Sequence, residues 1–326
     1  MRDPKFWSHR GSVLAALLSP LGALYGASVK LRHARANPFR PKARVVCVGN
    51  LTAGGSGKTP IAIALARICV GRGLKPMFLT RGYGGRLAWP VLVDPHQHAS
   101  ADVGDEPLLL AATAPTIVAR DRAAGAKLAD TLGADLIVMD DGFQNFQIVK
   151  DLSFVVVDAT LGFGNGHLIP AGPLREPVSQ GLARADALVL MGDGDPAIAF
   201  AGPVLRARTV AAAPEALKDR AVFAFAGIGN PERFFALLRN AGASVVGTQA
   251  FADHHRFSEL ELSVLRLGCE KFGALCVTTE KDYFRLEPRQ RARIVPVPVF
   301  ARFDDDGASL NALLDRVARA RNEGAA

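Results

Sequence analysis

Thr52-Ala53-Gly54-Gly55-Ser56-Gly57-Lys58-Thr59 stands between an apolar run, residues 43–48, and a segment with helical periodicity. This order of strand, glycine-rich turn and helix is typical of a phosphate-binding loop, whose backbone N–H groups point at phosphate oxygens. Lys58 would reach the β- and γ-phosphates, and the Thr59 hydroxyl would hold Mg²⁺. Thr52 replaces the first glycine of the motif G-x-x-x-x-G-K-[ST], so a glycine turn without a ligand is the alternative. The flanking strand and helix favour nucleotide binding.

Farther along, a second apolar run, residues 134–139, ends in Asp140-Asp141-Gly142-Phe143-Gln144. A continuous apolar run is typical of a central parallel strand. The carboxyl end of such a strand is where phosphate-loop proteins keep the aspartate that supports Mg²⁺. We therefore predict that Asp140 or Asp141 forms a metal site with Thr59. The sequence alone leaves open which of the two binds the ion.

Other charged residues fall where predicted strands end or helices begin. Arg81 follows a predicted strand, and ligands of doubly wound sheets bind at that edge. Asp105 and Glu106 occupy the first turn of a helix, where an acidic cluster that complements the helix dipole is the plain alternative. Arg175 lies between prolines in Gly172-Pro-Leu-Arg-Glu-Pro177, which restricts its backbone and suits either a fixed phosphate contact or an ordinary surface arginine.

Residues 1–44 do not fit a nucleotide-binding fold, because an apolar segment is followed there by a basic one. Pro20 interrupts the apolar part, which makes its length marginal for a membrane-spanning helix. One helical face collects the apolar residues Val13, Leu17, Leu21 and Leu24. The basic cluster after it comprises Lys30, Arg32, Arg35, Arg40, Lys42 and Arg44. The pattern favours an amphipathic helix in an anionic membrane interface. There are two alternatives. One is a signal peptide, although export would carry the nucleotide site away from ATP. The other is a helix packed on the protein's own core.

The composition is that of a globular protein large enough for two domains. The chain has 326 residues, of which 49% are hydrophobic and 21% charged. Its net charge of +8 favours an anionic partner, which could be a membrane surface, a phosphorylated substrate or nucleic acid. The four cysteines show no C-x-x-C spacing and are predicted to be buried, reduced thiols: Cys47, Cys69, Cys269 and Cys276.

The predicted fold class is α/β. Strands and helices alternate through residues 45–202, which predicts a P-loop NTPase-like, mostly parallel sheet with helices on both faces. Residues 1–44 would form the N-terminal amphipathic helix and basic segment. Residues 203–215 are predicted to be a linker, and residues 216–326 a smaller C-terminal α/β domain that includes a terminal helix. Within it, Gly227-Ile-Gly229 lacks the third glycine of a dinucleotide-binding motif.

Together these segments resemble the tetraacyldisaccharide 4′-kinase family of lipid A biosynthesis. The matching pieces are Gly49-Asn-Leu-Thr-Ala-Gly-Gly-Ser-Gly-Lys-Thr-Pro60, Arg81-Gly-Tyr-Gly84, Gly104-Asp-Glu106, Asp140-Asp-Gly-Phe-Gln144, Gly172-Pro-Leu-Arg-Glu-Pro177, Phe251-Ala-Asp-His254 and Thr279-Glu-Lys-Asp282. They occur in the order that the family has and span most of the chain, and the family shares Thr52. Asn145 departs from the pattern, because many relatives have histidine there.

The resemblance implies an ATP-dependent kinase that moves the γ-phosphoryl group to the 4′-hydroxyl of a tetraacylated glucosamine disaccharide 1-phosphate, giving lipid IVA. Its cofactors would be ATP, bound by residues 52–59, and Mg²⁺. The N-terminal helix would dock on the cytoplasmic face of the bacterial inner membrane, so the partners would be the lipid substrate and an anionic membrane surface. We also expect a monomer that has no nucleic acid partner.

The resemblance also implies roles for individual residues. Asp105 would be the general base, and His254 from the second domain would orient it or share its proton. We expect the two to meet when the domains close over the substrates. Lys58 would hold the phosphates of ATP, and Arg175 would contact either the transferring phosphoryl oxygens or the phosphate of the lipid. Glu106 would reach the metal. Weaker candidates for substrate contacts are Arg81, Arg122, Gln144 and Glu176.

Three other classes of protein fit the sequence less well. A regulatory GTPase needs a base-reading N/T-K-x-D element, but here Lys281 directly precedes Asp282. A partitioning ATPase carries a signature lysine early in its loop, where this chain has Ala53. A structural anion-binding domain would leave Asp140 and Asp141 unexplained.

Overall fold

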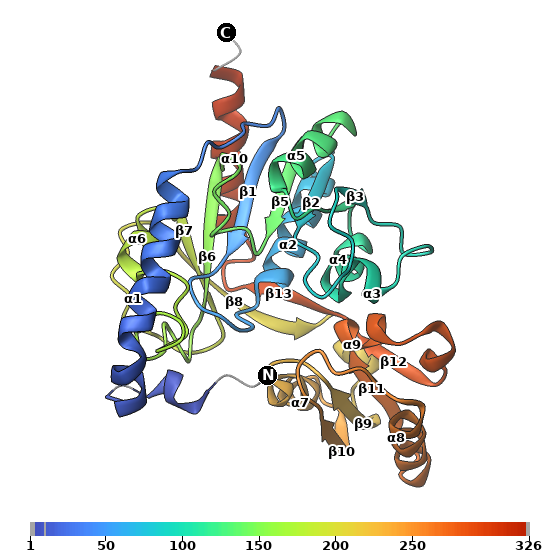
Figure 1. The fold of residues 1–326 in the computed structure, drawn as a ribbon. Coiled ribbons are helices and arrows are strands. Elements are labelled where there is room, and N and C mark those ends of the chain that lie inside the picture. The colour runs from blue at the N-terminus through green and yellow to red at the C-terminus, as the bar shows by residue number, and fades with distance from the viewer. Residues whose placement is uncertain (1–3, 10, 324–326) are drawn as a thin grey trace.

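The computed structural model describes residues 4–9 and 11–323. Residues 1–3 and 10 of the predicted N-terminal segment, and 324–326 of the predicted second domain, lie outside it. The chain forms one sheet of nine strands and one of four, each with helices packed on it (Figure 1). The predicted α/β class, with a large and mostly parallel sheet, is confirmed.

The nine-stranded sheet has the order β13-β8-β7-β6-β1-β5-β2-β4-β3. Its strands are β1 (Arg44–Gly49), β2 (Pro76–Thr80), β3 (Val91–Leu92), β4 (Thr116–Val118), β5 (Leu136–Asp140), β6 (Leu152–Asp158), β7 (Ala187–Met191), β8 (Val204–Ala211) and β13 (Val299–Phe303). The strands from β8 to β4 pair in parallel, and the two edge pairs are antiparallel. The middle strands are continuous apolar runs because both faces of the sheet are covered.

Helices close a hydrophobic core on each face of this sheet. Alternate residues of a strand point to opposite faces, so Val46 and Val48 of β1 lie in one core and Val45 and Cys47 in the other. The first core is closed by α2 (Lys58–Gly71), α4 (Asp105–Ala111) and α10 (Ala308–Glu323). The second is closed by α5 (Arg122–Thr131) and α6 (Val178–Leu182). The short α3 (Ser100–Val103) leads into α4.

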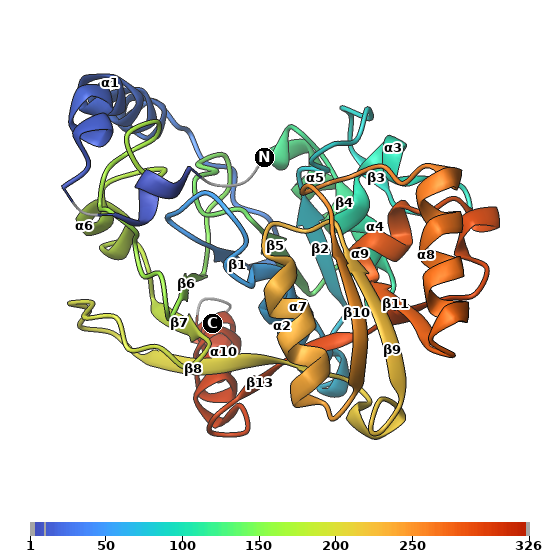
Figure 2. The same cartoon turned by 90° about the horizontal axis from the view of Figure 1, so that it is seen from below.

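The four-stranded sheet is parallel and carries one helix on each face (Figure 2). Its order is β10 (Ser244–Ala250), β9 (Ala221–Ala226), β11 (Leu275–Thr279) and β12 (Ile294–Val297). Phe234 and Phe235 of α7 (Pro231–Asn240) pack on one face, and Leu262 and Leu265 of α8 (Glu259–Lys271) pack on the other. Connecting elements are η2 (Pro214–Ala216), α9 (Glu280–Arg285) and η3 (Pro288–Arg291).

The predicted linker at 203–215 is corrected, because most of it is strand β8 of the large sheet. Its apolar residues alternate, and Leu205 and Ala207 are buried in the first core. Strand β13 then returns from the small sheet and pairs with β8, and Leu310 of α10 joins the same core. The terminal helix, expected in the second domain, therefore packs on the first. The chain crosses between the two sheets twice.

Helix α1 (Val13–Ala34) continues through Pro20 for 22 residues and lies beside α6 on the far side of the molecule from α8 (Figures 1 and 2). Its apolar face is exposed rather than packed on the protein: Leu17 is 72% exposed and Leu24 is 69% exposed. The helix contacts the protein with its small residues, and Gly22 and Gly26 lie against Leu168. In the described part of the chain, α1 alone is long and apolar enough to cross a membrane, by length and composition.

Candidate active site

The glycine-rich loop runs from the end of β1 to the start of α2, and its shape depends on Gly57. Gly57 precedes the first helical residue, Lys58, with a φ of 85°, a conformation that side chains rarely adopt. A Cβ there would also lie 3.0 Å from Met191 Cε. Within the loop, Asn50 Nδ2 donates to Ser56 Oγ at 3.0 Å. The buried Asn50, which sequence reasoning did not single out, therefore holds the two ends of the turn together.

Thr59 and Asp140 meet beneath this loop, as the sequence predicts. Thr59 Oγ1 donates to Asp140 Oδ2 at 3.0 Å, and both residues are buried. Asp140 Oδ1 is also buried and has no hydrogen-bond partner among the residues that the structure describes. Burial, and next the nearby Glu106 carboxylate, raise the pKa of Asp140 to about 7. An unpartnered carboxylate oxygen beside a hydroxyl is a donor set that Mg²⁺ prefers, so these residues fit the ion.

Asp141 differs from its neighbour because it is paired with cations. Arg175 Nη1 donates to Asp141 Oδ1 at 2.8 Å, and Lys58 Nζ lies 3.7 Å from the same oxygen. Burial opposes ionisation of Asp141, but the charges of Lys58 and Arg175 outweigh it and hold its pKa below the ordinary value. Three of the predicted phosphate-contacting and metal-binding residues thus share one cluster.

Gln144 and Glu176, two of the weaker candidates for substrate contacts, form hydrogen bonds beside this cluster. Gln144 Nε2 donates to the Asn50 carbonyl at 2.8 Å and to Glu176 Oε1 at 2.9 Å. The buried Glu176 also accepts two hydrogen bonds from Arg184, at 2.9 and 2.8 Å. Arg175 N donates to the Leu51 carbonyl at 2.7 Å, which ties the segment after Gly172 to the phosphate loop.

Arg81 and Arg122 lie at the neighbouring strand ends. Arg81 is exposed, whereas Arg122 is 4% exposed and its Nη1 donates to the Ala119 carbonyl. Arg122 Nε is buried without a hydrogen-bond partner among the described residues. Burial, and next the charge of Arg81, lower the pKa of Arg122 to about 10. A buried cation with a free donor is a better candidate for an anionic ligand than an exposed one.

Asp105 and His254 also lie close together, although Asp105 belongs to the domain of the nine-stranded sheet and His254 to that of the four-stranded sheet. Asp105 is the first residue of α4, and His254 Nδ1 lies 3.5 Å from Asp105 Oδ2. Burial alone would raise the pKa of Asp105, but His254 and Arg285 outweigh it and hold that pKa well below its ordinary range. The contact with Asp105 in turn raises the pKa of His254. The pair is assembled in this structure, so the expected domain closure is not needed to bring the two side chains together.

Two basic residues of α9 bind the start of α4, and sequence reasoning missed both roles. Arg285 Nε donates to Asp105 Oδ2 at 2.9 Å, and Lys281 Nζ lies 2.5 Å from Glu106 Oε1. Glu106, predicted to reach the metal, is therefore engaged by Lys281. The motif Thr279-Glu-Lys-Asp282 marks this helix in the sequence, but its contact with α4 depends on the tertiary fold.

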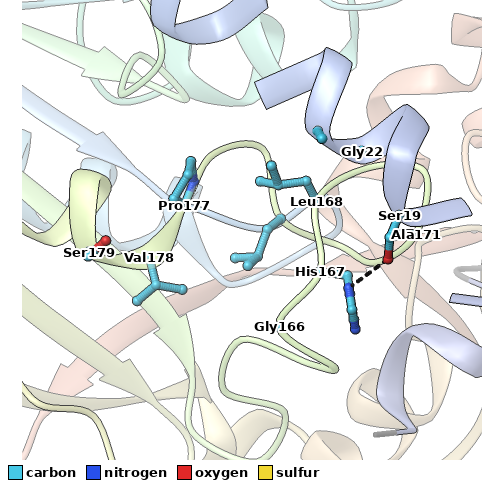
Figure 3. A pocket seen from close by; sticks show the side chains of 11 residues that line it. Ser19, Gly22, Gly166, His167, Leu168, Ala171, Pro177, Val178 and Ser179 are labelled. Carbon is cyan, nitrogen blue, oxygen red and sulfur yellow. Dashed lines mark hydrogen bonds between the residues drawn. The ribbon is translucent and has the colours of Figure 1, made fainter. Parts of the chain in front are cut away.

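A pocket of about 450 Å³ lies between α1 and the loop before α6 (Figure 3). Its lining is mostly apolar, with Gly22 of α1 on one side and Leu168 and Val178 on the other. Ser19 Oγ and His167 Nδ1, which both belong to its lining, lie 3.2 Å apart. The pocket therefore lies between the exposed N-terminal helix and the segment that includes Arg175.

A family model, curated relatives and a solved structure all match this chain to the same family. Residues 14–319 match the family Tetraacyldisaccharide-1-P 4′-kinase, LpxK. Proteins named tetraacyldisaccharide 4′-kinase from Nitrobacter winogradskyi and Paramagnetospirillum magneticum are 48% and 49% identical to this chain, over 98% and 97% of it and 99% of each relative. A crystal structure of the "apo" form of LpxK from Aquifex aeolicus in complex with ATP has a TM-score of 0.77 and 26% identity, and the match covers 94% of this chain and 99% of that one.

Proposed function

Because the chain belongs to the tetraacyldisaccharide 4′-kinase family, we propose that the residues gathered between its two sheets carry out the reaction of that family. The reaction is the ATP-dependent phosphorylation of the 4′-hydroxyl of a tetraacyldisaccharide 1-phosphate in lipid A biosynthesis. The observation that carries the residue assignment is the arrangement of Asp105. This carboxylate is buried, contacts His254 and has a pKa held well below its ordinary range. The charge of Lys281, which pairs with the adjacent Glu106, acts on both Asp105 and Asp140.

Lys58 and the loop amides would hold the phosphates of ATP, which places the γ-phosphoryl group at the carboxyl edge of the large sheet. We assign Asp140, with Thr59, as the residues that would hold Mg²⁺, since Asp141 is already paired with Arg175 and Lys58. Bound there, the ion would neutralise charge on the phosphate oxygens. Arg175, which approaches the same Asp141 oxygen as Lys58, would help to stabilise that charge.

Asp105 would accept the proton of the 4′-hydroxyl as the oxygen attacks phosphorus. A new O4′–P bond forms, the bond from the γ-phosphorus to the bridging oxygen breaks, and ADP leaves with that electron pair. His254 would keep the carboxylate ionised and aimed at the hydroxyl. Phosphoryl transfer asks little more of the protein than this positioning and charge neutralisation.

Transfer of label from γ-labelled ATP, with and without the tetraacyldisaccharide acceptor, tests this function. We expect label in the lipid when ATP is the donor, and far less when GTP replaces it. Nucleotide hydrolysis that does not depend on lipid, with no labelled lipid formed, would instead indicate a nucleotide-gated switch or partitioning ATPase.

We propose that α1 lies in the cytoplasmic interface of the inner membrane, where the lipid substrate is found. Its exposed leucines and the basic residues that follow support this placement. All the assigned catalytic residues come from one chain, so we propose that the enzyme works as a monomer, without a nucleic acid partner.

Replacing Leu17, Leu21 and Leu24 together with glutamine should move the protein from membrane to soluble fractions. A fully buried leucine contributes about 1.5–3 kcal/mol, so the loss of three should lower membrane partition by roughly 10³- to 10⁶-fold. The KM for lipid should rise more than the KM for ATP. The matched control is the same change at Leu260 and Leu267, exposed residues of α8 at the opposite end of the molecule (Figure 2). A triple variant that still sediments with vesicles at moderate salt would contradict the placement of α1.

A further inference from the structure

One buried guanidinium joins the two domains at the proposed base. Arg285 is the last residue of α9, and its side chain is only 7% exposed. Its Nε donates to Asp105 Oδ2 at 2.9 Å, and its Nη2 donates to the same oxygen at 2.5 Å. Its Nη1 donates to Asp282 Oδ1 at 2.6 Å. A single cation therefore lies between a carboxylate of the first domain and a buried carboxylate of the second.

Gly227 links this cation to the turn that carries His254. The Gly227 carbonyl accepts from Arg285 Nη1 at 2.8 Å and from the His254 backbone N–H at 3.0 Å. The Gly227 N–H donates to Asp282 Oδ2 at 3.0 Å. A Cβ on Gly227 would lie 3.1 Å from Asp282 Oδ1, so a side chain there would press on the carboxylate. The glycine that is weak evidence for a nucleotide motif is thus the centre of a hydrogen-bonded network.

We propose that Arg285 is a positioning residue for phosphoryl transfer, because it holds Asp105 and the turn carrying His254 in one fixed arrangement. The proposal rests on the assignment of Asp105 as the base. Within the described residues, the hydrogen bonds and ion pairs of the Asp105 side chain end on Oδ2, and none ends on Oδ1. Oδ1 is therefore the oxygen left to accept the hydroxyl proton, and Arg285 determines where it points.

Lys281 makes a second contact between the same two helices. It lies four residues before Arg285 on α9, and residues at this spacing share a helical face. Its Nζ pairs with Glu106 Oε1, while Arg285 pairs with the preceding residue, Asp105. Two ion pairs between α9 and α4 fix the rotation of α4 as well as its distance. Loss of Arg285 would therefore free the first residue of α4, Asp105, from its contact with α9.

The test compares kcat and KM in Arg285→Gln, Arg285→Lys and Arg285→Ala. We expect Arg285→Gln to lower kcat roughly 10²-fold, the cost of misplacing a reacting group by about 1 Å, with the KM for ATP unchanged. Arg285→Lys should recover part of the loss, because it keeps the charge but not the bidentate fork. Millimolar guanidinium should raise kcat of Arg285→Ala. The control, Arg289→Gln, changes an arginine that is 75% exposed and pairs with Glu287, and should leave kcat unchanged.

A double variant shows whether Arg285 acts through Asp105. In an Asp105→Asn background, Arg285→Gln should cause no further loss of kcat. A full additional loss, or an Arg285→Ala rate that guanidinium does not raise, would overturn the proposal while leaving Asp105 as the base. A normal rate in Asp105→Asn alone would refute the base assignment itself. If the glutamine and alanine variants do not fold, Arg285→Lys decides the matter, since a wild-type kcat in that variant would also overturn the proposal.

Discussion

Lys58→Ala should abolish measurable transfer of phosphate to the lipid and leave the protein folded. The ammonium is the one loop side chain placed to follow the β- and γ-phosphates, and losing one such charge contact in a preorganised site slows the chemical step on the order of 10³-fold. The fold should survive because Asp141, which Lys58 approaches to 3.7 Å, keeps its 2.8 Å contact with Arg175. Steady-state transfer and the unfolding temperature measure the two effects.

The control for Lys58→Ala is Lys75→Ala, which removes an exposed lysine from the loop between α2 and β2. This variant should transfer phosphate at the wild-type rate. Activity near wild type in Lys58→Ala would contradict the assignment of the glycine-rich loop as the phosphate site.

Asp105→Asn should lower kcat by roughly 10²- to 10⁴-fold, the usual range for loss of a positioned general base. The KM for ATP should change little, because Asp105 lies at the start of α4 and not in the phosphate loop. Asparagine keeps the size of the side chain, and Arg285 keeps its pairing with Asp282. The variant should therefore remain folded, and circular dichroism checks this point.

Asp102→Asn is the matched control for this change, since it replaces a carboxylate three residues earlier that pairs with the exposed Arg86. It should retain wild-type kcat. If Asp105→Asn instead kept a normal rate, Asp140 or Asp141 would become the next candidate for the base.

The centre of the large sheet could be predicted from local sequence alone. The runs at 136–139 and 154–157 are apolar without interruption, a pattern typical of strands that are covered on both faces of a sheet. The glycine-rich loop and the Asp140-Asp141 tip follow such runs directly. Because parallel strands bring their carboxyl ends to one edge, the contact between Thr59 and Asp140 follows from the pattern.

The edge of the sheet could not be predicted in the same way. Strand β8 alternates polar and apolar residues, a pattern that an edge strand, a hairpin or an extended linker all share. In the fold it pairs with β7 on one side and, on the other, with β13, which lies almost 90 residues later in the sequence. The same pairing carries α10 back to the first core, so the terminal helix was assigned to the wrong domain.

The charged residues at the base of α4 show a similar limit. Sequence reasoning placed Asp105 and His254 in the site by family resemblance, and the two do lie 3.5 Å apart. It did not predict Arg285 or the Lys281–Glu106 pair, because those contacts join residues more than 170 positions apart. It also expected domain closure to assemble the pair, whereas the contacts of α9 with α4 already hold it together.

The central claim is that Asp105 and His254 act as one unit in proton transfer, and a double-mutant cycle in kcat tests it most directly. His254→Asn is the suitable partner variant, because His254 has a φ of 58° and asparagine tolerates that conformation. Residues that act as a unit are strongly non-additive, so the double variant should be scarcely slower than Asp105→Asn alone. Full additivity of the two losses would contradict the claim and show that His254 works on another group.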